Sequence, residues 1–116
     1  MYYENFRSLL VDLDNDFELM NEIMKDLDLL IEETKVNVDT GLKANDSDII
    51  GRAVHKLKGA LLNFRAIEEV NLLDSMEAQC KSNIINSVDS NLKIIYKSLI
   101  KLSFDYKIYY KDNHPT

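Results

Sequence analysis

The segment GRAVHKLKGALLNFRA, residues 51–66, holds the side chains of this sequence that are best suited to chemistry. An unperturbed imidazole titrates near pH ~6.5, so much of an exposed histidine such as His55 is an uncharged nucleophile at neutral pH. Lys58 follows one helical turn later, where an ammonium group can neutralise an anion that arrives at the ring, such as a phosphoryl group. The spacing therefore predicts a nucleophilic histidine that meets an anionic group.

Two of the three glycines of the chain, Gly51 and Gly59, lie four residues before and four residues after His55. A glycine inside a helix costs roughly 1 kcal/mol relative to alanine. Residues four apart are neighbours on a helix surface, so two glycines leave the imidazole clear of its own helix. We expect this clearance to let a large partner approach the ring.

The charge of the same segment differs from that of the rest of the chain, whose net charge is −6. Residues 1–50 carry 13 acidic and 4 basic side chains, whereas residues 51–65 carry no acidic side chain. The basic side chains of this cationic segment are Arg52, Lys56, Lys58 and Arg65. A local excess of positive charge favours an anionic ligand or partner, while the net charge argues against a nucleic-acid-binding protein.

Five helices are predicted from the period of the apolar residues, and the scarcity of glycine and proline argues against many short strands. The predicted helices cover about residues 3–13, 16–42, 47–64, 67–81 and 87–111. Short connections make neighbouring helices antiparallel, so we expect an all-α protein. Its predicted architecture is an up-down-up-down four-helix bundle with the short first helix as a lid. Residues 1–111 would form this single domain, and residues 112–116 a frayed tail.

Helix ends are predicted from local signals. Asn15 followed by Glu18 is typical of a capping box at the start of the second helix. Gly41 and the polar residues after it are expected to end that helix, and Asp46 or Ser47 to cap the third.

The third helix is expected to present His55 to solvent, because its apolar stripe lies on the opposite side. Arg52 and Lys58 flank the histidine, and Leu62 lies two turns beyond it on the same face. Gly51, Arg52, Lys56, Leu62 and Arg65 are the predicted partner-binding residues.

The remaining features bound the class of protein. Cys80 is the only cysteine, which excludes an internal disulfide and a cysteine metal cluster. The first residues lack the basic and apolar regions of a secretory signal, and no apolar run approaches a membrane span. We expect a soluble, cytoplasmic protein that binds neither membrane nor metal.

The segment HKLKGALLNFRA resembles the signature of histidine-containing phosphotransfer (HPt) domains. That signature reads His, any residue, Leu, Lys, Gly, four residues, an apolar residue, Gly and a small residue. The matching residues are His55, Leu57, Lys58, Gly59, Phe64 and Ala66. The downstream segment LLDSMEAQC also resembles the Leu-rich helix of the family, which ends in an apolar–Glu pair, here Met76 and Glu77. One position departs from the signature, because Arg65 stands where the family usually has glycine.

The resemblance implies a phosphorelay intermediate and not a kinase. His55 would attack the phosphorylated aspartate of a response-regulator receiver domain through Nε2 and pass the phosphoryl group to a second receiver. Lys58 would stabilise the phosphoryl group, and Gly59, helped by Gly51, would provide clearance. The protein would need no cofactor of its own, with Mg²⁺ held by the receiver. Its partners would be receiver domains or a hybrid histidine kinase, and it would be a monomer.

Other classes of protein share parts of this pattern. A histidine-kinase dimerisation domain usually has an acid directly after its histidine and a proline five residues on, where this chain has Lys56 and Ala60. A chemotaxis-kinase N-terminal domain shares the HPt fold but implies a longer chain. A helical docking module that binds receivers or other partners without taking phosphate stays an alternative. A metal-dependent enzyme is disfavoured, because no Glu-x-x-His spacing occurs.

Overall fold

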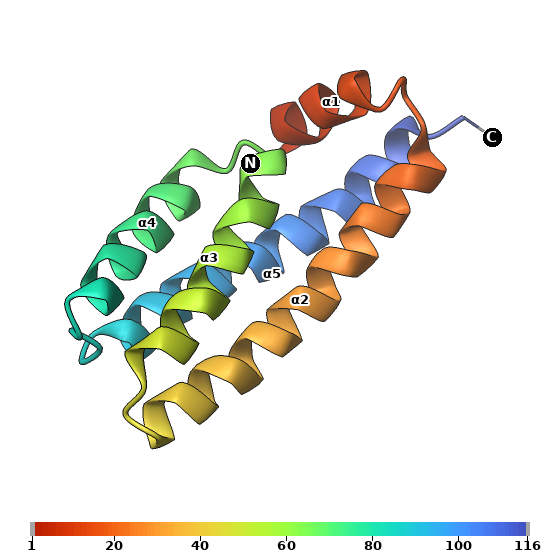
Figure 1. Cartoon of the computed structure of the whole chain (residues 1–116). Coiled ribbons are helices and arrows are strands. Elements are labelled where there is room, and N and C mark those ends of the chain that lie inside the picture. Colours follow the sequence, from red (N-terminus) through yellow and green to blue (C-terminus); the bar gives the residue numbers. More distant parts are fainter. Residues whose placement is uncertain (1, 116) are drawn as a thin grey trace.

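The computed structural model describes residues 2–115, and helices make up most of that part of the chain (Figure 1). The helices are α1 (Tyr3–Asp12), α2 (Phe17–Lys43), α3 (Ser47–Asn63), α4 (Ile67–Lys81) and α5 (Val88–Asn113). No strand occurs within the described residues. The prediction of an all-helical chain is therefore confirmed, and each predicted helix boundary lies within two residues of the observed one.

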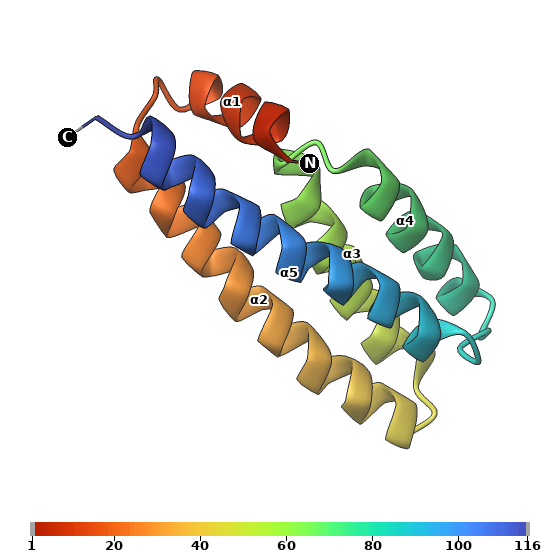
Figure 2. The same ribbon diagram turned by 180° about the vertical axis from the view of Figure 1, so that it is seen from behind.

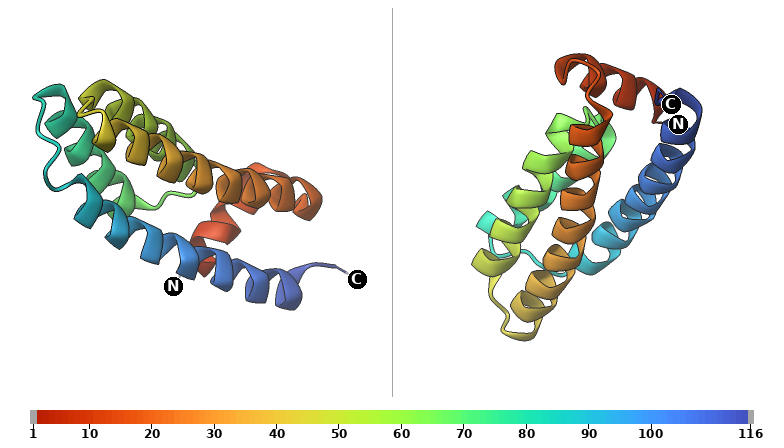
Figure 3. Two further views of the ribbon diagram at one scale, coloured as in Figure 1. Left: turned by 90° about the horizontal axis from the view of Figure 1, so that it is seen from below. Right: turned by 90° about the vertical axis from the view of Figure 1, so that its right-hand side faces the viewer.

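Helices α2 to α5 lie side by side, and α1 lies across one end of the group (Figures 1 and 2). Consecutive helices from α2 to α5 run in opposite directions, as the turns in Figure 3 show. Helix α3 packs against α2 and α4, and α5 packs against α4, α2 and α1. The molecule is elongated, with extents of 50 × 21 × 20 Å.

The buried side chains form stripes at helical spacing, which explains why these segments fold as helices. The buried stripe of α3 consists of Ile50, Ala53, Val54, Leu57 and Leu61. The stripe of α5 consists of Val88, Leu92, Ile95, Leu99, Leu102, Asp105, Tyr106 and Tyr109. Burying one such leucine or isoleucine stabilises the fold by about 1.5 to 3 kcal/mol. The stripes meet in one core, so each helix is held by the face that it turns away from solvent.

Each of the helices α1 to α4 ends in a Schellman motif, in which the chain turns through a residue with left-handed backbone. These residues are Asp14, Asn45, Arg65 and Asn83, with φ of 54°, 50°, 52° and 60°. At the end of α3, the Arg65 N–H donates to the Leu62 carbonyl at 3.0 Å and the Ala66 N–H to the Leu61 carbonyl at 3.3 Å. The motif usually has glycine at the left-handed position, but here every such residue carries a side chain.

The predicted capping box at the start of α2 is wrong. Asp16 is the N-cap, and its carboxylate accepts a hydrogen bond from the Leu19 N–H at 3.0 Å. Asn15 has a φ of 61°, which places it in the preceding turn and not in the extended backbone of an N-cap. Of the two predicted caps of α3, Asp46 and Ser47, the structure selects Asp46, which accepts bonds from the N–H groups of Asp48 and Ile49.

Gly41 does not end α2, contrary to the prediction. It lies buried inside the helix, which continues to Lys43. A Cβ at this position would lie 2.6 Å from Ile50 Cγ1, so the glycine is needed for the close approach of α3 to α2.

The C-terminal helix continues beyond its predicted end at residue 111, so residues 112 and 113 of the predicted tail are helical. Asn113 donates a side-chain hydrogen bond to the Tyr109 carbonyl at 2.9 Å. The His114 ring stacks on Tyr110 with centroids 4.1 Å apart. These contacts extend an aromatic cluster around Phe6 of α1, and they hold the end of the helix in place. Residues 1 and 116 lie outside the described part.

None of the described helices combines the length and the apolar content that crossing a membrane requires.

Candidate functional site

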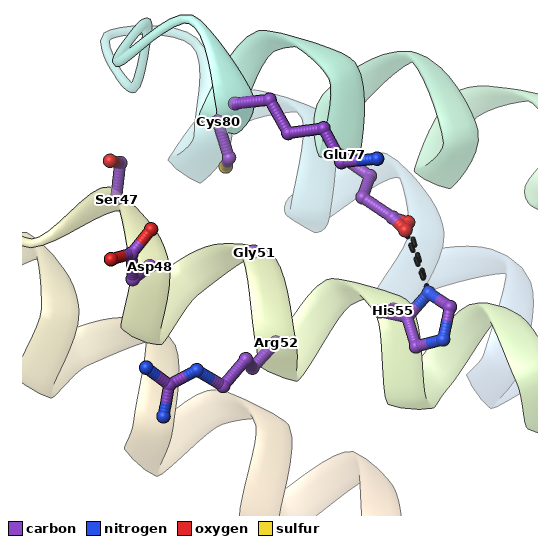
Figure 4. Close-up of a pocket in the computed structure, with 8 residues that line it drawn as sticks. Ser47, Asp48, Gly51, Arg52, His55, Glu77 and Cys80 are labelled. Atoms are coloured by element: carbon purple, nitrogen blue, oxygen red, sulfur yellow. Dashed lines mark hydrogen bonds and ion pairs between the residues drawn. The ribbon is translucent and has the colours of Figure 1, made fainter.

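The side chain of His55 stands on the solvent side of α3, opposite the buried stripe, as predicted. It is 70% exposed. Its Nδ1 lies 2.7 Å from Oε1 of Glu77, which α4 contributes from across the helix pair (Figure 4). In Figure 4 the second ring nitrogen lies on the side of the ring away from Glu77. The ring is therefore both exposed and held in one orientation.

The Glu77 carboxylate determines which ring nitrogen carries the proton. Burial alone raises the pKa of Glu77, but the hydrogen bonds and charges of His55 and Lys58 outweigh it and hold that pKa below its ordinary value. An ionised carboxylate only accepts hydrogen bonds, so His55 Nδ1 must donate. In the neutral ring this leaves the lone pair on Nε2, the nitrogen that faces solvent.

Lys58 lies in an ion-pair network and not free at the surface. Its Nζ is 3.1 Å from Asp74 Oδ1 and 3.2 Å from Glu77 Oε2, and its side chain is only 17% exposed. The hydrogen bonds to Asp74 and Glu77 raise the pKa of the Lys58 ammonium group. The two oxygens of Glu77 thus connect His55 and Lys58 through one carboxylate.

A groove of about 450 Å³ runs from His55 along the junction of α3 and α4. Figure 4 shows the side chains from both helices that surround it. They are Ser47, Asp48, Gly51, Arg52, His55, Glu77, Cys80 and Lys81. The histidine therefore stands at the rim of a hollow that a convex partner surface can enter.

The two glycines near His55 have different surroundings. A Cβ on Gly51 would lie 3.4 Å from Cys80 Cβ, so this glycine sits where α3 packs against α4. A Cβ on Gly59 would meet no atom within 4 Å. Packing inside the described part of the chain gives no reason for glycine at position 59, and the surface there is open.

The other predicted partner-binding residues do not all line the groove beside the histidine. Arg52 is exposed and lines the same groove as His55. Leu62 is 51% exposed, as expected. Lys56 instead pairs with Glu33 of α2 at 2.8 Å. Arg65 pairs with Asp12 of α1 at 3.0 Å, beyond the end of α3.

The sequence predictions missed the two acidic residues of the network, Asp74 and Glu77. They lie three residues apart on α4, and that spacing places both on one helix face. Which face meets His55 depends on how α4 packs against α3, which the spacing alone does not show. Glu77 carried a resemblance to the HPt family, but no role was predicted for it.

Among residues 2–115, no three histidine, cysteine or carboxylate side chains are grouped as ligands of a metal ion would be. Comparisons with protein-family models, with curated proteins and with solved structures found no significant match to this chain.

Proposed function

We propose that the protein is a histidine phosphotransfer protein that relays a phosphoryl group between receiver aspartates. In this proposal α2 to α5 form an antiparallel up-down-up-down four-helix bundle of the HPt type, with α1 at one end. The observation that carries the proposal is the state of His55. Its ring is exposed, Nδ1 is bound by Glu77, and Nε2 is presented to solvent.

The transfer step follows from that state. The Nε2 lone pair forms a bond to the phosphorus of a receiver aspartyl phosphate while the bond from phosphorus to the aspartate oxygen breaks. The aspartate leaves as a carboxylate with the electron pair of that bond. The ring keeps its proton on Nδ1 and gains a positive charge, which the Glu77 carboxylate offsets from 2.7 Å. The reverse reaction on a second receiver regenerates the neutral ring.

Lys58 supports the step through the same carboxylate. Its ammonium group pairs with both Asp74 and Glu77, so it holds Glu77 in place for His55. A phosphoryl group on Nε2 adds negative charge beside this network. We expect Lys58 to exchange the exposed Asp74 for a phosphoryl oxygen, since Asp74 is 70% exposed and is readily solvated when released.

Gly59 supports a macromolecular partner. The other two glycines lie against atoms of neighbouring helices, whereas Gly59 faces open space. No packing contact within the described residues requires glycine at position 59, which lies one turn from His55. Close approach of a second protein explains why a side chain is missing there.

The test is phosphoryl transfer from receiver domains. A panel of receivers charged with radioactive phosphate is mixed with the protein, and label on the protein is followed. We expect acid-labile, base-stable label that is absent from His55→Ala. His114→Ala is the matched control, because it removes the only other histidine of the chain and should accept phosphate normally.

Label on His55→Ala would overturn the assignment of the acceptor. Receiver binding without label on the wild-type protein would instead establish the alternative, a helical docking module that takes no phosphate.

A further inference from the structure

A second surface with an unusual composition lies opposite the His55 groove. Helix α3 packs against α4, and α5 against α2, so the α2/α5 side faces away from the histidine (Figure 2). Large apolar side chains are exposed there on both helices. They are Leu29 (64% exposed), Val36 (63%), Ile100 (71%), Phe104 (63%) and Ile108 (38%). We call these residues the α2/α5 surface.

The α2/α5 surface borders a groove of about 430 Å³ between the two helices. Ile100 and Phe104 form part of its wall, and Tyr96 lies in it. The buried Tyr96 hydroxyl has no hydrogen-bond partner among residues 2–115.

The charges of the two helices are opposite in sign. Helix α2 contains seven acidic and three basic residues. Helix α5 contains five lysines and three acidic residues, of which Asp105 is buried. The chain therefore carries, side by side, an acidic helix and a basic helix that both expose apolar side chains.

We propose that the α2/α5 surface binds a second copy of this chain, in place of the monomer that the HPt resemblance implies. A two-fold axis parallel to the helices places α5 of each copy opposite α2 of the other, which pairs basic with acidic and apolar with apolar residues. A membrane fits less well, because the acidic α2 and the net charge of −6 would repel anionic lipids.

The levels of the residues along the helices agree with this pairing. Ser103 donates to Asp28 at 3.1 Å, and Lys35 lies 5.1 Å from the centre of the Tyr96 ring. These two contacts place Phe104 near the level of Leu29. They also place Lys97 near the level of Glu32. Rotation about the proposed axis does not change a residue's position along the helix axis. Phe104 therefore meets Leu29 of the second copy, and Lys97 meets its Glu32.

Sedimentation velocity from about 1 to 500 µM, a range that covers weak to moderate self-association, tests the proposal. We expect the wild-type protein to dimerise and Phe104→Asp to raise the dissociation constant at least about tenfold. Phe104 is exposed, so the variant should fold, which circular dichroism checks. Ile67→Asp is the matched control, because Ile67 is 59% exposed on α4, and its dissociation constant should not change.

Charge reversal tests the geometry. Lys97→Glu and Glu32→Lys should each weaken the dimer about threefold or more, and an equimolar mixture of the two variants should restore it. A wild-type protein that stays monomeric overturns the proposal, and so does a dimer that Phe104→Asp leaves intact.

Binding to vesicles of phosphatidylserine and phosphatidylcholine tests whether the α2/α5 surface instead contacts a membrane. If they bind a monomeric wild-type protein but not Phe104→Asp, the surface serves a membrane and the proposal is wrong.

Discussion

At the scale of single residues, Glu77 connects the chemistry of His55 to the stability of the fold. Its carboxylate accepts from the imidazole at 2.7 Å and pairs with the Lys58 ammonium group at 3.2 Å. Removing its charge therefore changes both the orientation of the ring and the energy of a network whose centre, Lys58 and Glu77, is mostly buried. In the proposed function Glu77 is a positioning residue, because it does not touch the phosphoryl group.

Glu77→Gln should slow phosphate acceptance by roughly tenfold, the effect of losing about 1.4 kcal/mol of hydrogen bonding in the transition state. The label should still appear on His55. Lys111→Gln is the control, because that lysine lies in the last turn of α5, outside the network and outside the predicted partner-binding residues. An unchanged transfer rate in Glu77→Gln would show that the carboxylate does not position the ring.

The same substitution predicts a pH dependence of stability. The pKa of Glu77 is lower in the folded protein than in the unfolded chain, so its ionised form favours folding. This contribution is complete above the unfolded pKa of about 4.3 and is lost as the pH falls through the folded pKa. In urea unfolding, Glu77→Gln should be less stable than wild type by about 1 to 2 kcal/mol at pH 7, and the difference should shrink below about pH 4. A difference that is constant with pH would contradict this.

Substitutions at Gly59 separate the effect of a side chain on folding stability from its effect on the approach of a partner. Gly59→Ala should raise the free energy of unfolding by about 0.5 to 1 kcal/mol, because no atom within 4 Å opposes the new Cβ. Gly59→Leu should also fold, yet it should obstruct the receiver and slow transfer. Thermal unfolding and label transfer, measured on the same samples, separate the two effects. Wild-type transfer by Gly59→Leu would mean that the partner does not approach this part of α3.

At the scale of elements, the end of α3 shows how a residue with a side chain is accommodated where the HPt signature, which this segment resembles, has glycine. Arg65 occupies the left-handed position of the Schellman motif, with a φ of 52°. Glycine is the residue that this backbone favours, so the usual glycine at this position has a local physical reason. The side chain of Arg65 reaches Asp12 of α1, which gives the larger residue a contact that glycine lacks.

Arg65→Gly should stabilise the protein by roughly 0.5 kcal/mol. Glycine removes the strain of a side chain in left-handed backbone, which stabilises the protein by about 1 kcal/mol. Loss of the exposed ion pair with Asp12 offsets part of this gain in stability. Arg65→Ala is the informative control, since it loses the ion pair but keeps a Cβ in the left-handed region. In urea unfolding the alanine variant should be less stable than the glycine variant by about 1 kcal/mol. Equal stabilities would mean that the turn is not strained by a side chain.

At the scale of the whole molecule, charge is distributed unevenly over the elements. The acidic residues of the first half lie on α1 and α2 and in the turns that follow them, except Asp48 in the first turn of α3. The cationic segment around His55 begins after Asp48 and covers the rest of α3. The pairs that Lys56, Lys58 and Arg65 make with Glu33, Glu77 and Asp12 neutralise part of that segment. Arg52 and Lys81 are both exposed and line the groove, where they can attract an anionic partner.

The association rate with a phosphorylated receiver should therefore fall as salt rises from about 0.05 to 0.5 M, because the Debye length shortens. Arg52→Ala should lower the rate at low salt and flatten the salt dependence. Lys111→Ala, in the last turn of α5 and outside both proposed surfaces, should change neither. Stopped-flow binding measures these rates. A rate that does not depend on salt would exclude electrostatic steering by this face.

Local periodicity in the sequence determined the helices. The apolar stripes of α3 and α5 set their extents and placed His55 on the solvent side, because a helix surface is fixed by spacing alone. The Asp46 cap was predictable for the same reason, since a cap acts on the next residues in the chain. The capping box at Asn15 failed for a local reason, since the backbone of Asn15 is left-handed. Another prediction failed where a neighbouring helix decides. Gly41 was expected to end α2, yet it remains inside because Ile50 of α3 packs against it.

The tertiary structure alone decided the content of the candidate site. Glu77 and Asp74 reach His55 and Lys58 only because α4 packs against α3, and nothing in the spacing along α4 fixes the rotation of that helix. The packing of α4 against α3 also buries most of the Lys58 side chain and forms the groove beside Gly51. Residue types and helical spacing thus predicted the exposure of His55, which the structure confirms. The tautomer, the ion-pair network and the groove depend on contacts between helices, which local sequence does not encode.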